Sequence, residues 1–138
     1  MMEWLEYPSK EAWGARKQWF EALENSFVDE RASYGLSDQA CALVGEVQVA
    51  FCAGAWVTVL VMAIAVIESH ASEFGYPDLT DNPTWQKLRK RRNSIVHFQE
   101  KHPGISLDQQ WLNRPQLEAE AKEATKLMFE VFYSDVGT

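Results

Sequence analysis

The feature that most constrains the fold is a run of 21 residues, Val47 to Ile67, without a charged side chain. A run of this length can cross a lipid bilayer as a helix. Against a membrane span, Glu46 and Glu68 flank the run on both sides, a glutamine lies inside it, and its tryptophan is central. A helix that is apolar on all faces also suits the middle of a helical bundle. We therefore expect a buried helix and no membrane partner, with a membrane span as the alternative.

Apolar residues at helical spacing predict further helices on both sides of this run, and no segment reads convincingly as a strand. Ser9 and Ser37 are placed as N-caps of the first two helices, Gly75 ends the second, and Asp81 or Asn82 caps the third. The expected helices cover about 9–33, about 38–74, a segment after Asn82 and a segment from near Pro115. Their short connections favour an all-α antiparallel bundle of four main helices in one domain, 1–138.

The long apolar helix has further consequences for assembly and for the cysteines. Three neighbouring helices leave part of such a helix uncovered, so we expect a second copy of the chain to cover the rest in a homodimer. Cys41 and Cys52 lie eleven residues apart on the predicted helix, about 16 Å, and cannot form a disulfide with each other. Reduced, buried thiols and the lack of a signal-peptide pattern indicate a cytoplasmic protein.

The chain is acidic, with a net charge of −7 and a pI of about 4.9. Its surface as a whole does not attract nucleic acid, so any function on RNA must depend on a local site. Positive charge gathers in "LRKRRNSIVHF", residues 88–98, on the third predicted helix. At about 100° per residue, Arg92 falls in the middle of the apolar side of that helix, which comprises Trp85, Leu88, Ile95 and Val96, whereas Lys87, Lys90 and Arg91 face solvent.

A guanidinium that points inward needs hydrogen-bond acceptors, because it keeps its proton. The two acids at the ends of the uncharged run, Glu68 and Glu46, are the candidate partners of Arg92 in an ion pair that orients two helices. Asn93 and His97 are one helical turn apart on a common flank. An amide and an imidazole are therefore expected beside the inward Arg92.

The segment "RRNSIVH" resembles the signature of HEPN domains, in which an Arg, followed directly by a polar residue, is separated from a His by four to six residues. Arg92, Asn93 and His97 match it here. In that family the motif lies on a late helix of a bundle of four or five helices. The resemblance implies a homodimeric, metal-independent endoribonuclease that uses no cofactor and places two copies of the motif across one cleft.

The resemblance also implies a role for each residue. His97 would act as general base or acid, Arg92 would hold the scissile phosphate through two hydrogen bonds, and Asn93 would orient the imidazole or the phosphate. Lys90 and Arg91 would bind flanking phosphates of the RNA. Some toxin members carry a tyrosine two positions after the His, where this chain has Gln99, so regulation by modification of that tyrosine is not inferred.

Two functions are left open by these residues. One is the ribonuclease, in defence or as a toxin with a cognate antitoxin or partner protein. The other is a noncatalytic HEPN-like helical dimerisation or interaction module in which Arg92 and His97 brace the dimer. No metal site is expected, because the three histidines (His70, His97, His102) and the two cysteines show no recognised metal-ligand spacing.

Overall fold

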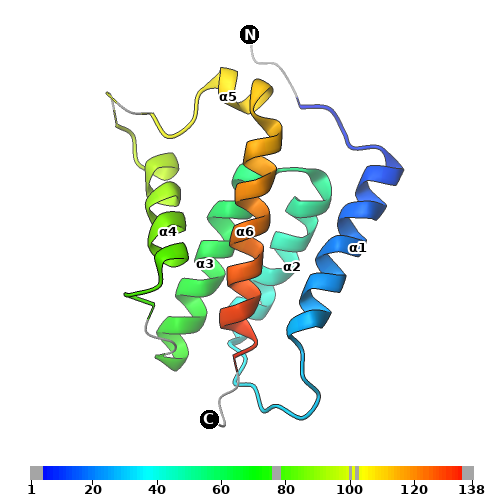
Figure 1. Ribbon diagram of the computed structural model, residues 1–138, viewed down its shortest axis with the longest axis vertical. Helices are drawn as coiled ribbons and strands as arrows, with labels where there is room; N and C mark the ends of the chain where they lie inside the picture. Colours follow the sequence, from blue (N-terminus) through cyan, green and yellow to red (C-terminus); the bar gives the residue numbers. More distant parts are fainter. Residues whose placement is uncertain (1–4, 76–78, 100, 102, 135–138) are drawn as a thin grey trace.

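The computed structural model describes residues 5–75, 79–99, 101 and 103–134. Within these residues the protein is all-α and has no strand, which confirms the all-α part of the predicted fold class, but it has six helices rather than four main ones. In Figure 1, α6 crosses the front of the molecule, α2 and α3 lie behind it, and α1 and α4 form the two edges. The helices are α1 (Lys10–Phe27), α2 (Asp38–Ala53), α3 (Trp56–Phe74), α4 (Pro83–Val96), α5 (Leu107–Leu112) and α6 (Arg114–Phe132).

The prediction of one continuous helix over 38–74 is wrong, because the chain turns between α2 and α3. Gly54 has a φ of 76°, in the left-handed region, and its N–H donates to the carbonyls of Ala50 and Phe51. The N–H of Ala55 also reaches back to the Ala50 carbonyl at 2.9 Å. This is a glycine-based C-terminal cap that satisfies the last carbonyls of α2. The uncharged run is therefore divided between two helices.

Helix α3 still meets the length and composition criteria for a membrane span, and among the described residues no other helix does. Of its most apolar 18-residue window, 39% is buried inside the protein. Helix α3 packs against α2, α4 and α6. Core helices of soluble proteins meet the same criteria, so the absence of a membrane span stays a prediction.

Aromatic side chains from three helices form the centre of the core. Phe20 of α1, Phe51 of α2 and Phe129 of α6 are all fully buried. The ring centroid of Phe20 lies 5.7 Å from that of Phe51 and 5.1 Å from that of Phe129, distances typical of favourable aromatic pairs. Because Phe20 is the buried residue of α1, this cluster anchors α1 to the bundle.

The predicted N-cap positions agree with the structure better than the predicted helix lengths do. Ser9, Ser37 and Asn82 each accept a hydrogen bond from the N–H three residues further on. Helix α1 ends at Phe27 rather than near residue 33. The segment 107–112, expected as loop, forms the short helix α5 with a capping box. Cys52 is buried as expected, but Cys41 is exposed.

Candidate functional site

The basic stretch lies on α4 at one edge of the bundle (Figure 1), where the helix packs against α3 and α6. Leu88 is buried, and Trp85 and Ile95 pack against the core while partly exposed. Val96, expected on the inner side, is instead 48% exposed. Val96 is the last residue of α4.

Arg92 forms an ion pair with Glu68 of α3, with 2.5 Å between Nη1 and Oε1. Its Nε also donates a hydrogen bond to Asn93 Oδ1 at 2.8 Å. The Arg92 side chain is 17% exposed and that of Glu68 is 42% exposed, so the pair lies at the rim of the contact between α3 and α4. The structure thus pairs Arg92 with one of its two expected acids. The other, Glu46, is exposed on α2 and forms no ion pair with Arg92 within the described part of the chain.

The two other motif residues occupy the end of α4. The side-chain Oδ1 of Asn93 accepts a hydrogen bond from Arg92. The backbone carbonyl of Asn93 accepts a second hydrogen bond, from the backbone N–H of His97, at 3.0 Å. His97 is the C-cap residue, has extended backbone dihedrals and is exposed. Its imidazole makes no hydrogen bond to Arg92 or Asn93 in the described structure. The motif therefore has a partly buried, paired arginine and a histidine open to solvent.

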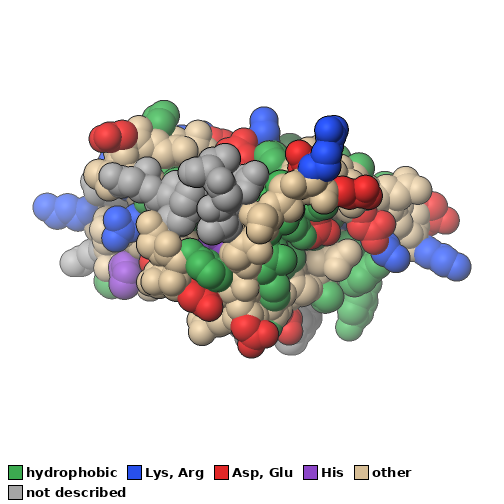
Figure 2. All heavy atoms as spheres, turned by 90° about the horizontal axis from the view of Figure 1, so that it is seen from below, with side chains coloured by type: hydrophobic (Ala, Val, Ile, Leu, Met, Phe, Trp, Pro, Cys, Tyr) green, Lys and Arg blue, Asp and Glu red, His purple; other side chains and the backbone are tan. Residues whose placement is uncertain are grey.

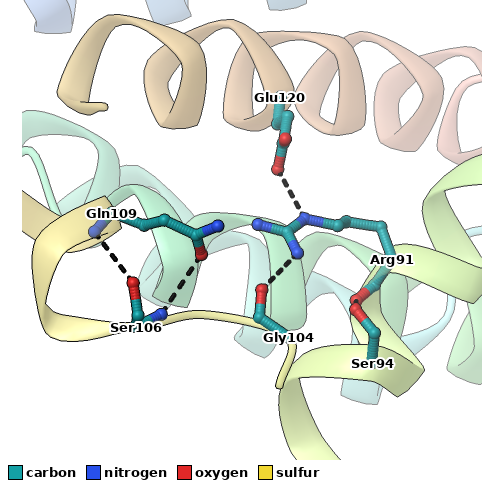
Figure 3. A network of polar contacts seen from close by, with 6 residues as sticks. All are labelled: Arg91, Ser94, Gly104, Ser106, Gln109 and Glu120. Carbon is teal, nitrogen blue, oxygen red and sulfur yellow. Dashed lines mark hydrogen bonds and ion pairs between the residues drawn. The ribbon is translucent and has the colours of Figure 1, made fainter. Parts of the chain in front are cut away.

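Arg91, expected to bind RNA phosphate from a solvated face, is held inside the protein. Its Nε lies 2.9 Å from Glu120 Oε2 of α6, and its Nη1 donates to the carbonyl of Gly104. Figure 3 shows the guanidinium between these two partners. Its side chain is 25% exposed. Arg91 thus joins α4, α6 and the loop after α4, and its charge is already paired.

The loop after α4 lies so close to the helix that it requires a glycine. A Cβ atom on Gly104 would lie 1.9 Å from the backbone carbonyl oxygen of Ser94, much nearer than any real contact. The same loop continues into the capping box of α5, in which Ser106 and Gln109 exchange hydrogen bonds (Figure 3). Together with Arg91, this geometry fixes the path of the loop beside the end of α4.

A groove of about 680 Å³ runs along α4. Trp85, Arg89 and Asn93 line it at intervals of four residues, and Lys90 lines it beside them. Arg89 and Lys90 are exposed and have no acidic partner among the residues described. By contrast, Lys87 pairs with Glu123 at 2.6 Å. Arg89 and Trp85 were not predicted as site residues, although their spacing to Asn93 places all three on one helical face.

The groove is a local concentration of positive charge on a protein that is acidic overall. Figure 2 shows one end of the molecule, where acidic side chains spread over the surface and lysines and arginines lie mostly at the margins. With a net charge of −7, the protein attracts an anion only where cations lack a nearby acid. On α4 these cations are Arg89 and Lys90.

The described fold and site define an all-α protein with a basic groove beside a partly buried arginine. No model of a known protein family matches the chain, and no curated protein or solved structure matches it either. Function is therefore inferred from the α4 residues themselves. His102 lies outside the described residues, and no group of three or more potential metal ligands occurs among the described ones. Chemistry without a metal stays a prediction.

Proposed function

We propose that the protein is a metal-independent endoribonuclease of HEPN type that acts as a cytoplasmic homodimer. The observation that carries the proposal is the position of Asn93, which both accepts a hydrogen bond from Arg92 and lines the groove with the two unpaired cations. An RNA strand in this groove lies next to Arg92. Arg89 and Lys90 meet its phosphates, and the ring of Trp85 offers a surface on which a base stacks.

The chemistry needs three proton and charge events. A base removes the proton of the 2′-hydroxyl, whose oxygen attacks the adjacent phosphorus; the resulting phosphorane carries extra negative charge; an acid then protonates the departing 5′-oxygen. His97 is exposed and suits either proton transfer, since imidazole titrates near neutrality. Two copies of His97, one from each protomer, supply the base and the acid.

Arg92 stabilises the phosphorane in this scheme. Its Nη1 and Nε are bound to Glu68 and Asn93, whereas Nη2 has no hydrogen bond to any described residue. Nη2 is therefore the group of Arg92 that remains available to a phosphate oxygen without breaking a described contact. Because Glu68 is 42% exposed, water can solvate it when Arg92 turns toward the phosphate.

The surface around His97 supports the homodimer. Phe98 is 90% exposed and Val96 is 48% exposed, so two apolar side chains flank the imidazole. Burial of large apolar side chains against a second copy removes them from water and brings two His97 residues together. A monomeric mass in light scattering at micromolar concentration contradicts this part of the proposal.

A second function is favoured by the completeness of the Arg92 contacts. Glu68 and Asn93 already give the guanidinium two partners, as expected of a residue that orients α4 on α3. In this alternative the protein is a noncatalytic HEPN-like dimerisation or interaction module. A cognate antitoxin or partner protein, and a defence role, are compatible with both functions.

The deciding experiment is cleavage of a mixed RNA substrate in EDTA by the purified protein and by His97→Ala. We expect cleavage by the wild type and its loss in the variant. No cleavage by the wild type, or equal cleavage by both proteins, rejects the nuclease. Thermal melting of the variant serves as the folding control, and because His97 is exposed, its removal is expected to leave the melting temperature nearly unchanged.

RNA binding provides a second measurement that does not need catalysis. In the His97→Ala background, removal of Lys90 by substitution with Gln is expected to lower the slope of log K against log salt by roughly 0.7, the value of one phosphate contact on a single strand. Arg31→Gln is the matched control, because Arg31 is an exposed cation after the far end of α1. Equal slopes for both variants exclude the groove as the RNA site.

A further inference from the structure

Residues of the segment before α1 and of α1, α5 and α6 line a second cavity. In Figure 1 the start of α1 and helix α4 lie at opposite edges of the bundle. The cavity has a volume of about 370 Å³, within the range of small-molecule sites. Its walls include Arg16 of α1, Gly54 after α2, Trp111 of α5 and Arg114 of α6, together with the segment 5–9. We call this cavity the arginine pocket.

The two guanidiniums of the arginine pocket have no acidic partner in the described structure. Arg16 donates from Nη1 to the Cys52 carbonyl at 3.2 Å and lies over the Trp56 ring, 4.9 Å from its centroid. Arg114 donates from Nη1 to Gln110 at 2.7 Å and from Nη2 to the Gly54 carbonyl. Two positive charges therefore share one cavity, and neither forms an ion pair with a described carboxylate, although the charge of Glu118 acts to raise the pKa of Arg114.

A structural role explains only part of this arrangement. The carbonyls of Cys52 and Gly54 belong to the C-terminal end of α2, where positive charge is favourable. Capping them uses one N–H of Arg16 and one of Arg114, whereas each guanidinium has five. Burial, and next the charge of Arg16, lower the pKa of Arg114 below its ordinary value. The remaining N–H groups and the mutual repulsion both favour a bound anion.

We propose that the arginine pocket binds a nucleoside monophosphate, with the phosphate between Arg16 and Arg114. A phosphate accepts several charge-assisted hydrogen bonds, and guanidiniums match its geometry in pairs. Trp111 and the exposed Tyr7 supply aromatic surface for the base. Glu6 is the acid that lines the pocket; it is exposed and forms no ion pair with either arginine.

This inference does not rest on the proposed nuclease activity, because no residue of α4 takes part. The ligand is either a free nucleotide or the 5′-phosphorylated end of an RNA strand, which share the same chemistry. The two sources are separated by comparing AMP with short single strands that carry a 5′-phosphate or a 5′-hydroxyl, all in the His97→Ala protein to prevent cleavage. Preference for the phosphorylated strand over AMP assigns the strand end, and the opposite preference assigns the free nucleotide.

Isothermal titration of the full chain with AMP, inorganic phosphate and adenosine tests the proposal. We expect AMP to bind more tightly than phosphate and adenosine not to bind. Arg16→Gln should weaken AMP binding at least tenfold, Arg31→Gln should leave it unchanged, and Glu6→Gln should strengthen it severalfold by removing a like charge. No heat with AMP or phosphate at millimolar concentration overturns the proposal, as does an Arg16→Gln protein that binds normally.

Because Arg16 also caps α2, circular dichroism must show that its variant is folded. If it is not, Trp111→Ala decides, since Trp111 contributes no cap to α2. That substitution should reduce the affinity for AMP to that for phosphate and leave phosphate binding unchanged. AMP binding that is the same in Trp111→Ala, Glu6→Gln and the wild type would show that the ligand lies elsewhere.

Discussion

Replacement of Gly54 by Ala tests the turn that divides the apolar run into two helices. Gly54 has φ 76°, and an L side chain in this left-handed region costs about 1–2 kcal/mol. An added Cβ would also lie 2.9 Å from Arg16 Nη1, but this is the flexible end of a side chain and can move away. We expect Gly54→Ala to lower the free energy of unfolding by about 1–2 kcal/mol.

Gly45→Ala is the matched control, because the same change on the same helix has the opposite sign. Gly45 is exposed inside α2, and an added Cβ meets no atom within 4 Å. Alanine in an exposed helix interior is about 0.8–1 kcal/mol more favourable than glycine. The two variants should therefore differ by about 2–3 kcal/mol. Gly75→Ala, at φ 61° with nothing within 4 Å, isolates the backbone cost without the Arg16 contact.

The assay is thermal and urea unfolding followed by circular dichroism. For a chain of this size, 1 kcal/mol shifts the melting temperature by roughly 3–4 °C. Gly54→Ala should melt several degrees below the wild type and Gly45→Ala a few degrees above it. If Gly54→Ala raises the melting temperature as Gly45→Ala does, residues 38–74 form one continuous helix and the turn is refuted.

Three further predictions concern the site and the core. Arg92→Ala should lower the free energy of unfolding in urea by about 1 kcal/mol, because Glu68 is 42% exposed and is solvated once its partner is removed. A loss of about 3 kcal/mol or more would instead mean that Arg92 neutralises an acid that water does not reach. His70 is buried, and its Nδ1 has no described hydrogen-bond partner. Burial lowers the pKa of His70 below the ordinary 6.5, although the charge of Glu73 acts in the opposite direction. The folded protein therefore favours the neutral imidazole, and its full stability is present above about pH 6.5. Stability should fall as the pH drops below about 6.5, because the unfolded chain takes up the proton first, and His70→Phe should flatten this decline in urea unfolding at about pH 7.5 and 5.5. Gly104→Ala should force the loop away from Ser94 at a cost of about 1–3 kcal/mol and speed hydrogen exchange in 104–106; an unchanged exchange pattern contradicts the close approach.

Local chemistry allowed several features to be predicted from the sequence. Short polar side chains before helical patterns identified the caps at Ser9 and Ser37 and narrowed the third to Asp81 or Asn82, because such side chains reach an N–H three residues on; the structure shows that Asn82 is the third cap. The pairing of Arg92 with Glu68 followed from the need of an inward guanidinium for an anion. Such predictions succeed when the decisive interaction is either local or required by the charge of one residue.

Features that depend on residues distant in the sequence were missed. Gly45 and Gly54 both lie in an apolar helical pattern, yet only Gly54 leaves the helix, and there Arg114, 60 residues away, binds its carbonyl. Arg91 looked like a solvated cation because its partner Glu120 is 29 residues further along. The arginine pocket was missed for the same reason, since its two arginines come from the first and last helices. Periodicity on one helix carries no information about what another helix brings to it.

If the protein acts on RNA as we propose, its acidic net charge and the unpaired cations of α4 together set the conditions for binding. At physiological ionic strength charges are screened beyond about 8 Å, so a distant strand gains little attraction from Arg89 and Lys90 and meets a surface with an excess of acids. Attraction begins only when a phosphate enters the groove, where no acid neutralises these two cations. Base stacking on Trp85 adds a contact that depends little on salt. Under the proposed function, recognition would rest on the fit of a strand in the α4 groove, and the acidic surface would disfavour nucleic acid that does not reach it.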